Sequence, residues 1–126
     1  MDQSFKEQIA EAMREVASIT AEQADQRKRS NPYLLFLDPR DAADIRSTTG
    51  IIPDAMNVSL YDLKVTSDAE LPAALADRSG EFIVACQQGP MGALAAYALK
   101  KRGYHNVSFI EGGTQAWIDA GFPTSK

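Results

Sequence analysis

The sequence of 126 residues is poor in metal-binding and disulfide-forming residues, since it has one cysteine and one histidine. A single cysteine cannot form an intramolecular disulfide, which favours a reducing compartment. Cys86 and His105 lie far apart in the chain and do not provide the ligand set of a metal site. We therefore expect no metal and no cofactor, and His105 is expected to be a surface residue.

Positive charge and long apolar runs are also scarce. Lys and Arg total 13 against 17 Asp and Glu, which gives a formal net charge of -4. A nucleic-acid-binding protein should show a basic face, so nucleic acid is not expected as a partner. No stretch is apolar enough to cross a membrane, and the first residues lack the basic and apolar regions of a signal peptide. The sequence therefore predicts a cytoplasmic protein.

Apolar residues are sufficient for one core, because they make up 44% of a chain of ordinary single-domain length. Residues 1–17 are predicted to form an amphipathic N-terminal helix. Its apolar stripe has spacings of three and four and consists of Phe5, Ile9, Met13 and Val16. We expect this stripe to pack on the chain's own core, and the alternative is a dimer contact. The chain is thus predicted to be a monomer or a homodimer, with residues 18–126 as the main domain.

Strands and helices alternate along this main domain. Strands are predicted at 34–37, 81–85 and 107–110, with a weak one at 56–60. Helical segments are predicted at 20–29, 41–49, 67–75, 91–102 and 114–120, the first of them begun by a capping box of Thr20 and Gln23. The alternation predicts an α/β fold with a parallel sheet and helices on both of its faces.

Cys86 directly follows the predicted strand at 81–85 and precedes a loop that leads into the helix beginning near Met91. In an open α/β sheet, ligands bind at the carboxyl ends of the strands. Backbone N–H groups of such a loop and the helix N-terminus stabilise an anionic sulfur, either a thiolate or a persulfide. The position therefore favours a nucleophilic cysteine, and the alternative is a small core residue.

Four motifs in order, over roughly residues 19–123, resemble the rhodanese-like family of sulfurtransferases. They are Leu37-Asp38-Pro39-Arg40-Asp41, the segment 50–58, the loop 86–92, and Ile110-Glu111-Gly112-Gly113 followed by Trp117 and Ala120-Gly121-Phe122-Pro123. The resemblance implies a central five-stranded parallel sheet. It also implies that the thiolate of Cys86 takes a sulfane sulfur from a donor and passes it to an acceptor.

The resemblance also implies the partners and the site. The donor is a small sulfur compound such as thiosulfate or a protein persulfide, and the acceptor is a thiol or cyanide. The substrate-binding residues are Gln87, Gln88, Gly89, Pro90, Met91 and Gly92. Asp38 and Arg40 are expected to brace the loop rather than to take part in the chemistry.

Several positions depart from the family pattern, which has arginines at the positions of Gln87 and Met91 and a hydroxyl residue at Gly92. An arginine binds an oxyanion with two directed donors. Its loss costs about 1.5–3 kcal/mol of binding, so thiosulfate is expected to be a poor donor. Arg46 and Lys64 are candidates for a replacement cation.

The sequence also bears on two functions other than sulfur transfer. Phosphatases of this fold need an arginine after a Cys-x5 loop, and the chain has Gly92 there, so the sequence argues against a phosphatase. The absence of loop arginines leaves open a catalytically weak binding or redox-sensing module.

Overall fold

The computed structural model describes residues 4–88 and 90–125. Within these residues a five-stranded sheet has the order β1-β5-β4-β2-β3, and all neighbouring strands are parallel. The strands are β1 (Ala17–Ile19), β2 (Leu35–Asp38), β3 (Met56–Asn57), β4 (Glu81–Val84) and β5 (Asn106–Ile110). The predicted α/β fold with a five-stranded parallel sheet is confirmed.

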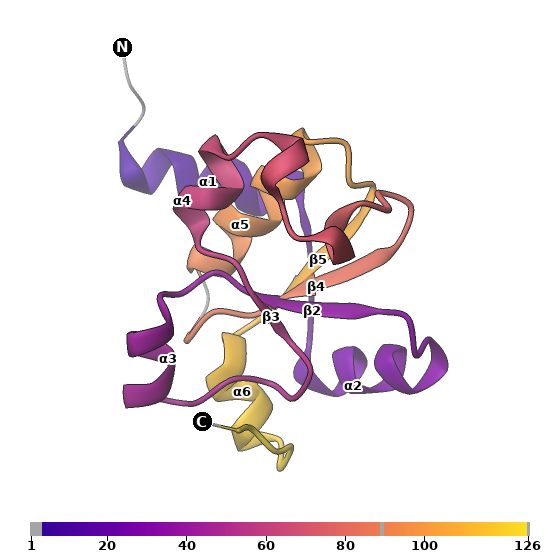
Figure 1. Ribbon diagram of the computed structural model, residues 1–126. Coiled ribbons are helices and arrows are strands. Elements are labelled where there is room, and N and C mark those ends of the chain that lie inside the picture. The colour runs from indigo at the N-terminus through magenta and orange to yellow at the C-terminus, as the bar shows by residue number, and fades with distance from the viewer. Residues whose placement is uncertain (1–3, 89, 126) are drawn as a thin grey trace.

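Helices cover both faces of this sheet, with α1, α4 and α5 on one side and α2 and α6 on the other (Figure 1). The helices are α1 (Phe5–Glu15), α2 (Ala21–Ser30), α3 (Ala42–Ser47), α4 (Leu60–Val65), α5 (Pro90–Lys101) and α6 (Gly113–Asp119), and two 3-10 turns, Asp68–Glu70 and Ala73–Leu75, lie between α4 and β4. None of the helices in the described part of the chain is long and apolar enough to cross a lipid bilayer.

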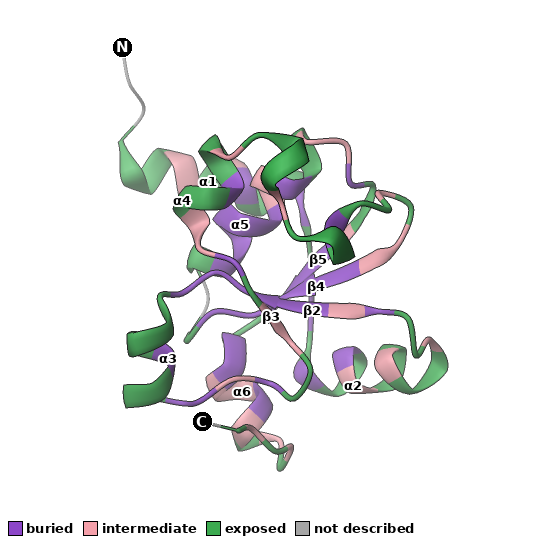
Figure 2. Cartoon of the chain, viewed as in Figure 1, coloured by how far each residue is buried: buried purple, intermediate pink, exposed green. Residues whose placement is uncertain are grey.

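The central strands are buried on both faces, as their continuous apolar runs predict. In β4, Phe82 and Val84 belong to the core shared with α1 and α5, whereas Ile83 belongs to the core shared with α2 and α6. Figure 2 shows the same pattern, with buried residues along β4 and β5 and exposed residues on the outer sides of the helices. The buried centre of the sheet fixes where β4 ends, and therefore where Cys86 lies.

Local signals account for several helix boundaries. The capping box of α2 is confirmed, because Thr20 Oγ1 accepts from Gln23 N at 3.1 Å and Gln23 Oε1 accepts from Thr20 N at 2.9 Å. The weak strand expected at 56–60 ends at Asn57, because Ser59 Oγ accepts from Asp62 N at 3.1 Å and begins α4. The sequence patterns did not predict α4 or β1. Strand β1 has only three residues, too few to show an alternation of apolar and polar side chains.

The apolar stripe of α1 packs on the core only in part. Ala12 is fully buried and Val16 is 5% exposed, whereas Phe5 is 63% and Met13 is 56% exposed. The small side chain of Ala12 marks the line along which α1 meets the core, and Met13 lies about a quarter-turn away from that line. The expectation of core packing was therefore wrong for Phe5 and Met13.

Tyr104 provides a pH-dependent part of the stability. It is 1% exposed, its hydroxyl donates to the backbone oxygen of Leu75, and burial raises its pKa above the ordinary value of 10.0. Above about pH 10 the unfolded chain loses this proton before the folded chain does, so stability falls as the pH rises. We expect the free energy of unfolding of the wild type to drop more between about pH 9 and 11 than that of Tyr104→Phe. Denaturant titrations at both pH values test this, and equal drops would contradict it.

Candidate active site

Cys86 lies at the carboxyl end of β4, in the middle of the sheet. Ala85 N continues the pairing with β2 by donating to Leu37 O at 3.0 Å, and the chain then leaves the sheet at Cys86. Cys86 is 4% exposed, and α5 begins four residues later at Pro90. The structure therefore has the strand–loop–helix geometry that the sequence predicted around this residue, although Gly89 lies outside the described residues.

The N-terminus of α6 holds the backbone of this loop. Thr114 N donates to Cys86 O at 2.7 Å, and Gln115 N donates to Gln87 O at 3.0 Å. The approach is so close that a Cβ on Gly113 would lie 2.6 Å from Cys86 O. Gly113, which also has a φ of 62°, thus allows α6 to dock directly on the loop.

These two hydrogen bonds also orient the loop amides. In a planar trans peptide the carbonyl of one residue and the N–H of the next point in opposite directions. Because the carbonyls of Cys86 and Gln87 point to α6, the N–H groups of Gln87 and Gln88 are directed away from it. Helix α6 therefore presets the direction of two donors that immediately follow the sulfur-bearing residue.

Cys86 lines an open cavity of about 410 Å³. Its lining residues are Phe5, Arg40, Asp44, Thr48, Cys86, Gln87, Gln88, Pro90 and Met91. The structure thus gathers around one hollow most of the loop residues expected to bind substrate, together with one residue of the supporting pair. Asp38 is not a lining residue and lies buried behind Arg40.

Gly92 lies directly against the cysteine rather than on the cavity wall. It is buried, and a Cβ added to it would be 3.8 Å from Cys86 Sγ and 3.7 Å from Cys86 N. A side chain at this position would start in van der Waals contact with the sulfur. The absence of a hydroxyl residue at position 92 therefore changes the immediate surroundings of Sγ.

Arg40 and Asp38 form a buried ion pair. The guanidinium donates from Nη2 to Asp38 Oδ2 at 2.7 Å and from Nε to Asp38 Oδ1 at 3.0 Å, and the two side chains are 5% and 2% exposed. Arg40 also donates to Thr48 Oγ1, Thr49 Oγ1 and Gly50 O. The pair therefore braces the segment 48–50 after α3. The positive charge of Arg40 is already balanced by the carboxylate of Asp38.

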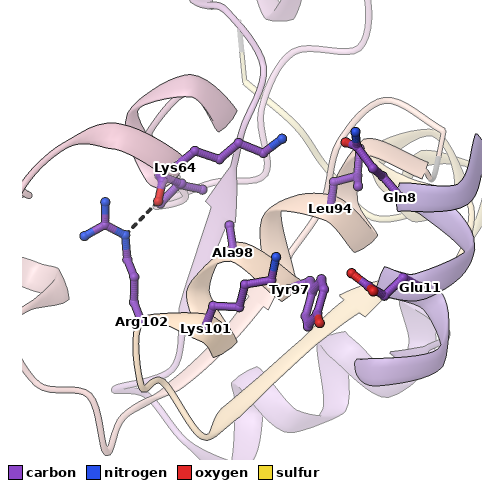
Figure 3. Close-up of a pocket in the computed structure, with 9 residues that line it drawn as sticks. Gln8, Glu11, Lys64, Leu94, Tyr97, Ala98, Lys101 and Arg102 are labelled. Atoms are coloured by element: carbon purple, nitrogen blue, oxygen red, sulfur yellow. Dashed lines mark hydrogen bonds between the residues drawn. The ribbon is translucent and has the colours of Figure 1, made fainter. Parts of the chain in front are cut away.

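Neither candidate for a replacement cation lies at this cavity. Arg46 is not among its lining residues, and Lys64 lines a different hollow between α1, α4 and α5 (Figure 3). In that hollow Arg102 Nε donates to Leu63 O at 2.7 Å, and the amine of Lys101 lies 4.3 Å from the ring centre of Tyr97. The suggestion that Arg46 or Lys64 replaces the loop arginine was wrong.

Sequence reasoning missed three residues at the Cys86 cavity: Phe5, Asp44 and Thr48. Phe5 belonged to a stripe assigned to the core, and Asp44 and Thr48 carry no motif of their own. The Asp38–Arg40 pair is a signal for the α3 residues. The segment that follows the pair folds back over it, because Arg40 donates to Thr48 Oγ1 and Thr49 Oγ1. The expectation that His105 is a surface residue holds, since His105 is exposed. Glu111 accepts a hydrogen bond from Ser18 Oγ at 2.9 Å, a contact between segments far apart in the sequence.

Comparison with known proteins identifies the family. The model of the rhodanese-like domain matches residues 20–120, which is most of the chain. The chain therefore belongs to the rhodanese-like domain family, as the four motifs indicated. The match begins after α1 and β1, so the N-terminal helix lies outside it.

The chain is also similar to a curated protein and to solved structures. Protein HIGH ARSENIC CONTENT 1, mitochondrial, of Arabidopsis thaliana is 39% identical over 54 residues, which are 43% of this chain but only 32% of that protein. A protein of unknown function from Rhodopseudomonas palustris, described as a possible tyrosine phosphatase, has a TM-score of 0.86 and 26% identity over 99% of this chain and 96% of its own. The polysulfide-sulfur transferase homodimer of Wolinella succinogenes has a TM-score of 0.74 and 22% identity over 96% and 86%, and it supports the fold alone.

Proposed function

We propose that the chain is a sulfurtransferase that carries sulfane sulfur as a persulfide on Cys86. The observation that carries this proposal is the position of Cys86 at the carboxyl end of β4, on a cavity and in a loop whose carbonyls are fixed by α6. The thiolate attacks the sulfane sulfur of the donor, a new S–S bond forms, and the old bond breaks with its electron pair leaving on the donor. The persulfide is anionic, and preset backbone donors stabilise such charge.

We further propose that thiosulfate is a poor donor. The charged residues that line the cavity are Arg40 and Asp44, and Arg40 is already paired with Asp38. A sulfonate entering the cavity therefore meets no uncompensated cation among the described side chains that line it. A lost charge-assisted contact of about 1.5–3 kcal/mol corresponds to a rate lower by about one to two decades.

Intact-mass spectrometry after exposure to inorganic polysulfide or thiosulfate tests both statements. We expect the wild type to gain the mass of one sulfur atom from polysulfide, and from thiosulfate at least about tenfold more slowly. Cys86→Ser, which removes the chain's only cysteine, should gain nothing. The adduct must also disappear on addition of cyanide, because a sulfinic acid adds nearly the same mass and is not reversed in this way.

The possible outcomes separate the candidate functions. A sulfur adduct on Cys86→Ser would contradict the assignment of the carrier residue. No adduct with any donor would instead favour the alternative, a binding or redox-sensing module that uses the fold without sulfur transfer. Efficient loading from thiosulfate would contradict only the statement about the donor.

The phosphatase description of the Rhodopseudomonas palustris protein is not extended to this chain. A phosphate clamp needs a guanidinium with two directed donors after the Cys-x5 loop. Position 92 is a buried glycine whose missing Cβ would already lie 3.8 Å from Sγ. The residue at that position therefore offers no donor to a phosphoryl group.

A further inference from the structure

A second cavity lies beside the Cys86 cavity and shares part of its wall. It has a volume of about 410 Å³, and its lining residues are Ile9, Met13, Ser18, Gln88, Pro90, Phe109, Glu111 and Gly112. Gln88 and Pro90 line both cavities, so the two cavities share these two residues as a common wall. The second cavity, which we call the α1 groove, therefore adjoins the cavity that Cys86 lines.

Helix α1 provides an apolar wall along both cavities. Phe5 lines the Cys86 cavity, while Ile9 and Met13 line the α1 groove. Their spacing of four residues places them along one side of the helix. Phe5 and Met13 are 63% and 56% exposed, so they present apolar surface to solvent beside the cysteine. Exposed apolar surface that is continuous with a cavity is typical of a binding groove.

Charge in the two cavities disfavours an anionic occupant. The α1 groove contains the exposed carboxylate of Glu111, and no Lys or Arg is among the described residues that line it. The Cys86 cavity adds exposed Asp44, and its Arg40 is paired with Asp38. The surroundings of Cys86 therefore combine apolar surface with negative charge, so an apolar group fits them better than an anionic one.

From these observations we infer that α1 selects the sulfur acceptor, and that the acceptor is an uncharged organic thiol whose apolar body occupies the α1 groove. This inference rests on the proposed function and names its substrate class. The family match begins at residue 20, so α1 lies outside the matched domain. It accounts for the two α1 side chains that the core does not bury.

The transfer step balances without an additional oxidant. The acceptor thiolate attacks the outer sulfur of the Cys86 persulfide and forms a new S–S bond. The bond between Sγ and the outer sulfur breaks, and its electron pair remains on Sγ as the thiolate. The acceptor's proton goes to solvent before the attack, and the product is the organic persulfide.

The experiment measures second-order rates of sulfur release from persulfide-loaded full-length protein to ethanethiol, butanethiol and hexanethiol. These thiols have similar sulfur nucleophilicity, and each rate is divided by that of the same thiol with free cysteine persulfide. We expect the ratio to rise about two- to fourfold for each added methylene group. The same ratio should be lower for mercaptopropanesulfonate than for propanethiol, because the sulfonate is anionic.

Met13→Gln provides the test of the groove, and Val65→Gln is its matched control. Both residues are exposed apolar side chains, 56% and 58% respectively, but Val65 on α4 lines neither cavity. We expect Met13→Gln to flatten the dependence on chain length, and Val65→Gln to leave it unchanged. Neither substitution replaces Cys86 or a residue of the loop 86–92.

Each result has one meaning. Failure of both polysulfide and thiosulfate to load Cys86 overturns the proposed function and this inference with it. Normal loading followed by equal ratios for all three thiols overturns the inference and leaves the proposed function standing. A dependence on chain length that survives Met13→Gln as fully as Val65→Gln overturns the assignment to the α1 groove.

Discussion

Replacing Arg40 with methionine is expected to lower the free energy of unfolding by about 3–5 kcal/mol. The substitution leaves Asp38, which is 2% exposed, as a buried carboxylate without its counter-charge. It also removes the donors that bind Thr48, Thr49 and the carbonyl of Gly50. Because a domain of this size has a total stability of about 5–15 kcal/mol, denaturant titration should show the loss clearly.

A surface ion pair of the same chemistry is the matched control. Arg29 Nε lies 2.9 Å from Asp25 Oδ2, but the two side chains are 75% and 22% exposed. Arg29→Met should therefore change the free energy of unfolding by only about 0.5 kcal/mol. Equal losses in Arg40→Met and Arg29→Met would show that burial of the Asp38–Arg40 pair contributes nothing.

The double variant Asp38→Asn/Arg40→Met tests whether the unpaired charge of Asp38 causes the loss of stability in Arg40→Met. Asparagine removes the buried charge and keeps an oxygen that can accept from the backbone N of residue 40. In the wild type this N, of Arg40, donates to Asp38 Oδ1 at 3.1 Å. If the uncompensated charge causes most of the loss, adding the second substitution should raise the stability of Arg40→Met. If the double variant is less stable than Arg40→Met, the loss of stability comes from packing and from the missing contacts of Arg40 to residues 48–50, and not from the unpaired charge.

The strands at the centre of the sheet were predictable because parallel strands covered on both faces appear in the sequence as short continuous apolar runs. The residues 82–84 of β4 alternate between the two cores, so each of them is buried. This burial on both faces explains why the strand appears in the sequence as a continuous apolar run. Edge elements carry less information. Strand β1 has three residues, and α4 has only the capping contact of Ser59 to distinguish it from an extended segment.

Part of the site was also predictable, because a cysteine between a buried strand and a helix must lie at the carboxyl edge of the sheet. The rest depends on contacts between distant segments that no local pattern records. Phe5 reaches the cavity only because α1 rests on the core through Ala12, and the loop amides are oriented by α6. Asp54 adopts a left-handed conformation with a φ of 66°, a region of backbone space that favours glycine.

Gly113→Ala is expected to cost more stability than any other glycine-to-alanine change among the described left-handed positions, and to slow persulfide formation on Cys86. The added Cβ would lie 2.6 Å from Cys86 O, 2.8 Å from Gln87 C and 2.9 Å from Gln87 O. These atoms are backbone and cannot turn aside as a flexible side chain does. Either α6 or the loop must therefore move.

Gly121→Ala separates this collision from backbone strain. Gly121 has a φ of 92°, so alanine there pays the penalty of a left-handed conformation, about 1–2 kcal/mol, but nothing lies within 4 Å of the new Cβ. Gly112→Ala is an intermediate case, because its Cβ would meet the Ala116 side chain at 2.8 Å rather than the cysteine loop. The three variants thus share the strain and differ in what the methyl group meets.

Movement of the loop away from α6 would break the hydrogen bonds of Thr114 N and Gln115 N and release the preset direction of the Gln87 and Gln88 amides. A displacement of about 1 Å at a reacting group can cost about 100-fold in rate, so we expect loading of Cys86 from polysulfide to slow about 10- to 100-fold in Gly113→Ala. Gly121→Ala should load at the wild-type rate, because the strain at its site does not reach the loop. Wild-type loading in Gly113→Ala, combined with a clear loss of stability, would mean that α6 moves while the loop keeps its shape. In that case the loop's own sequence, rather than its docking on α6, would determine the donor geometry at the sulfur.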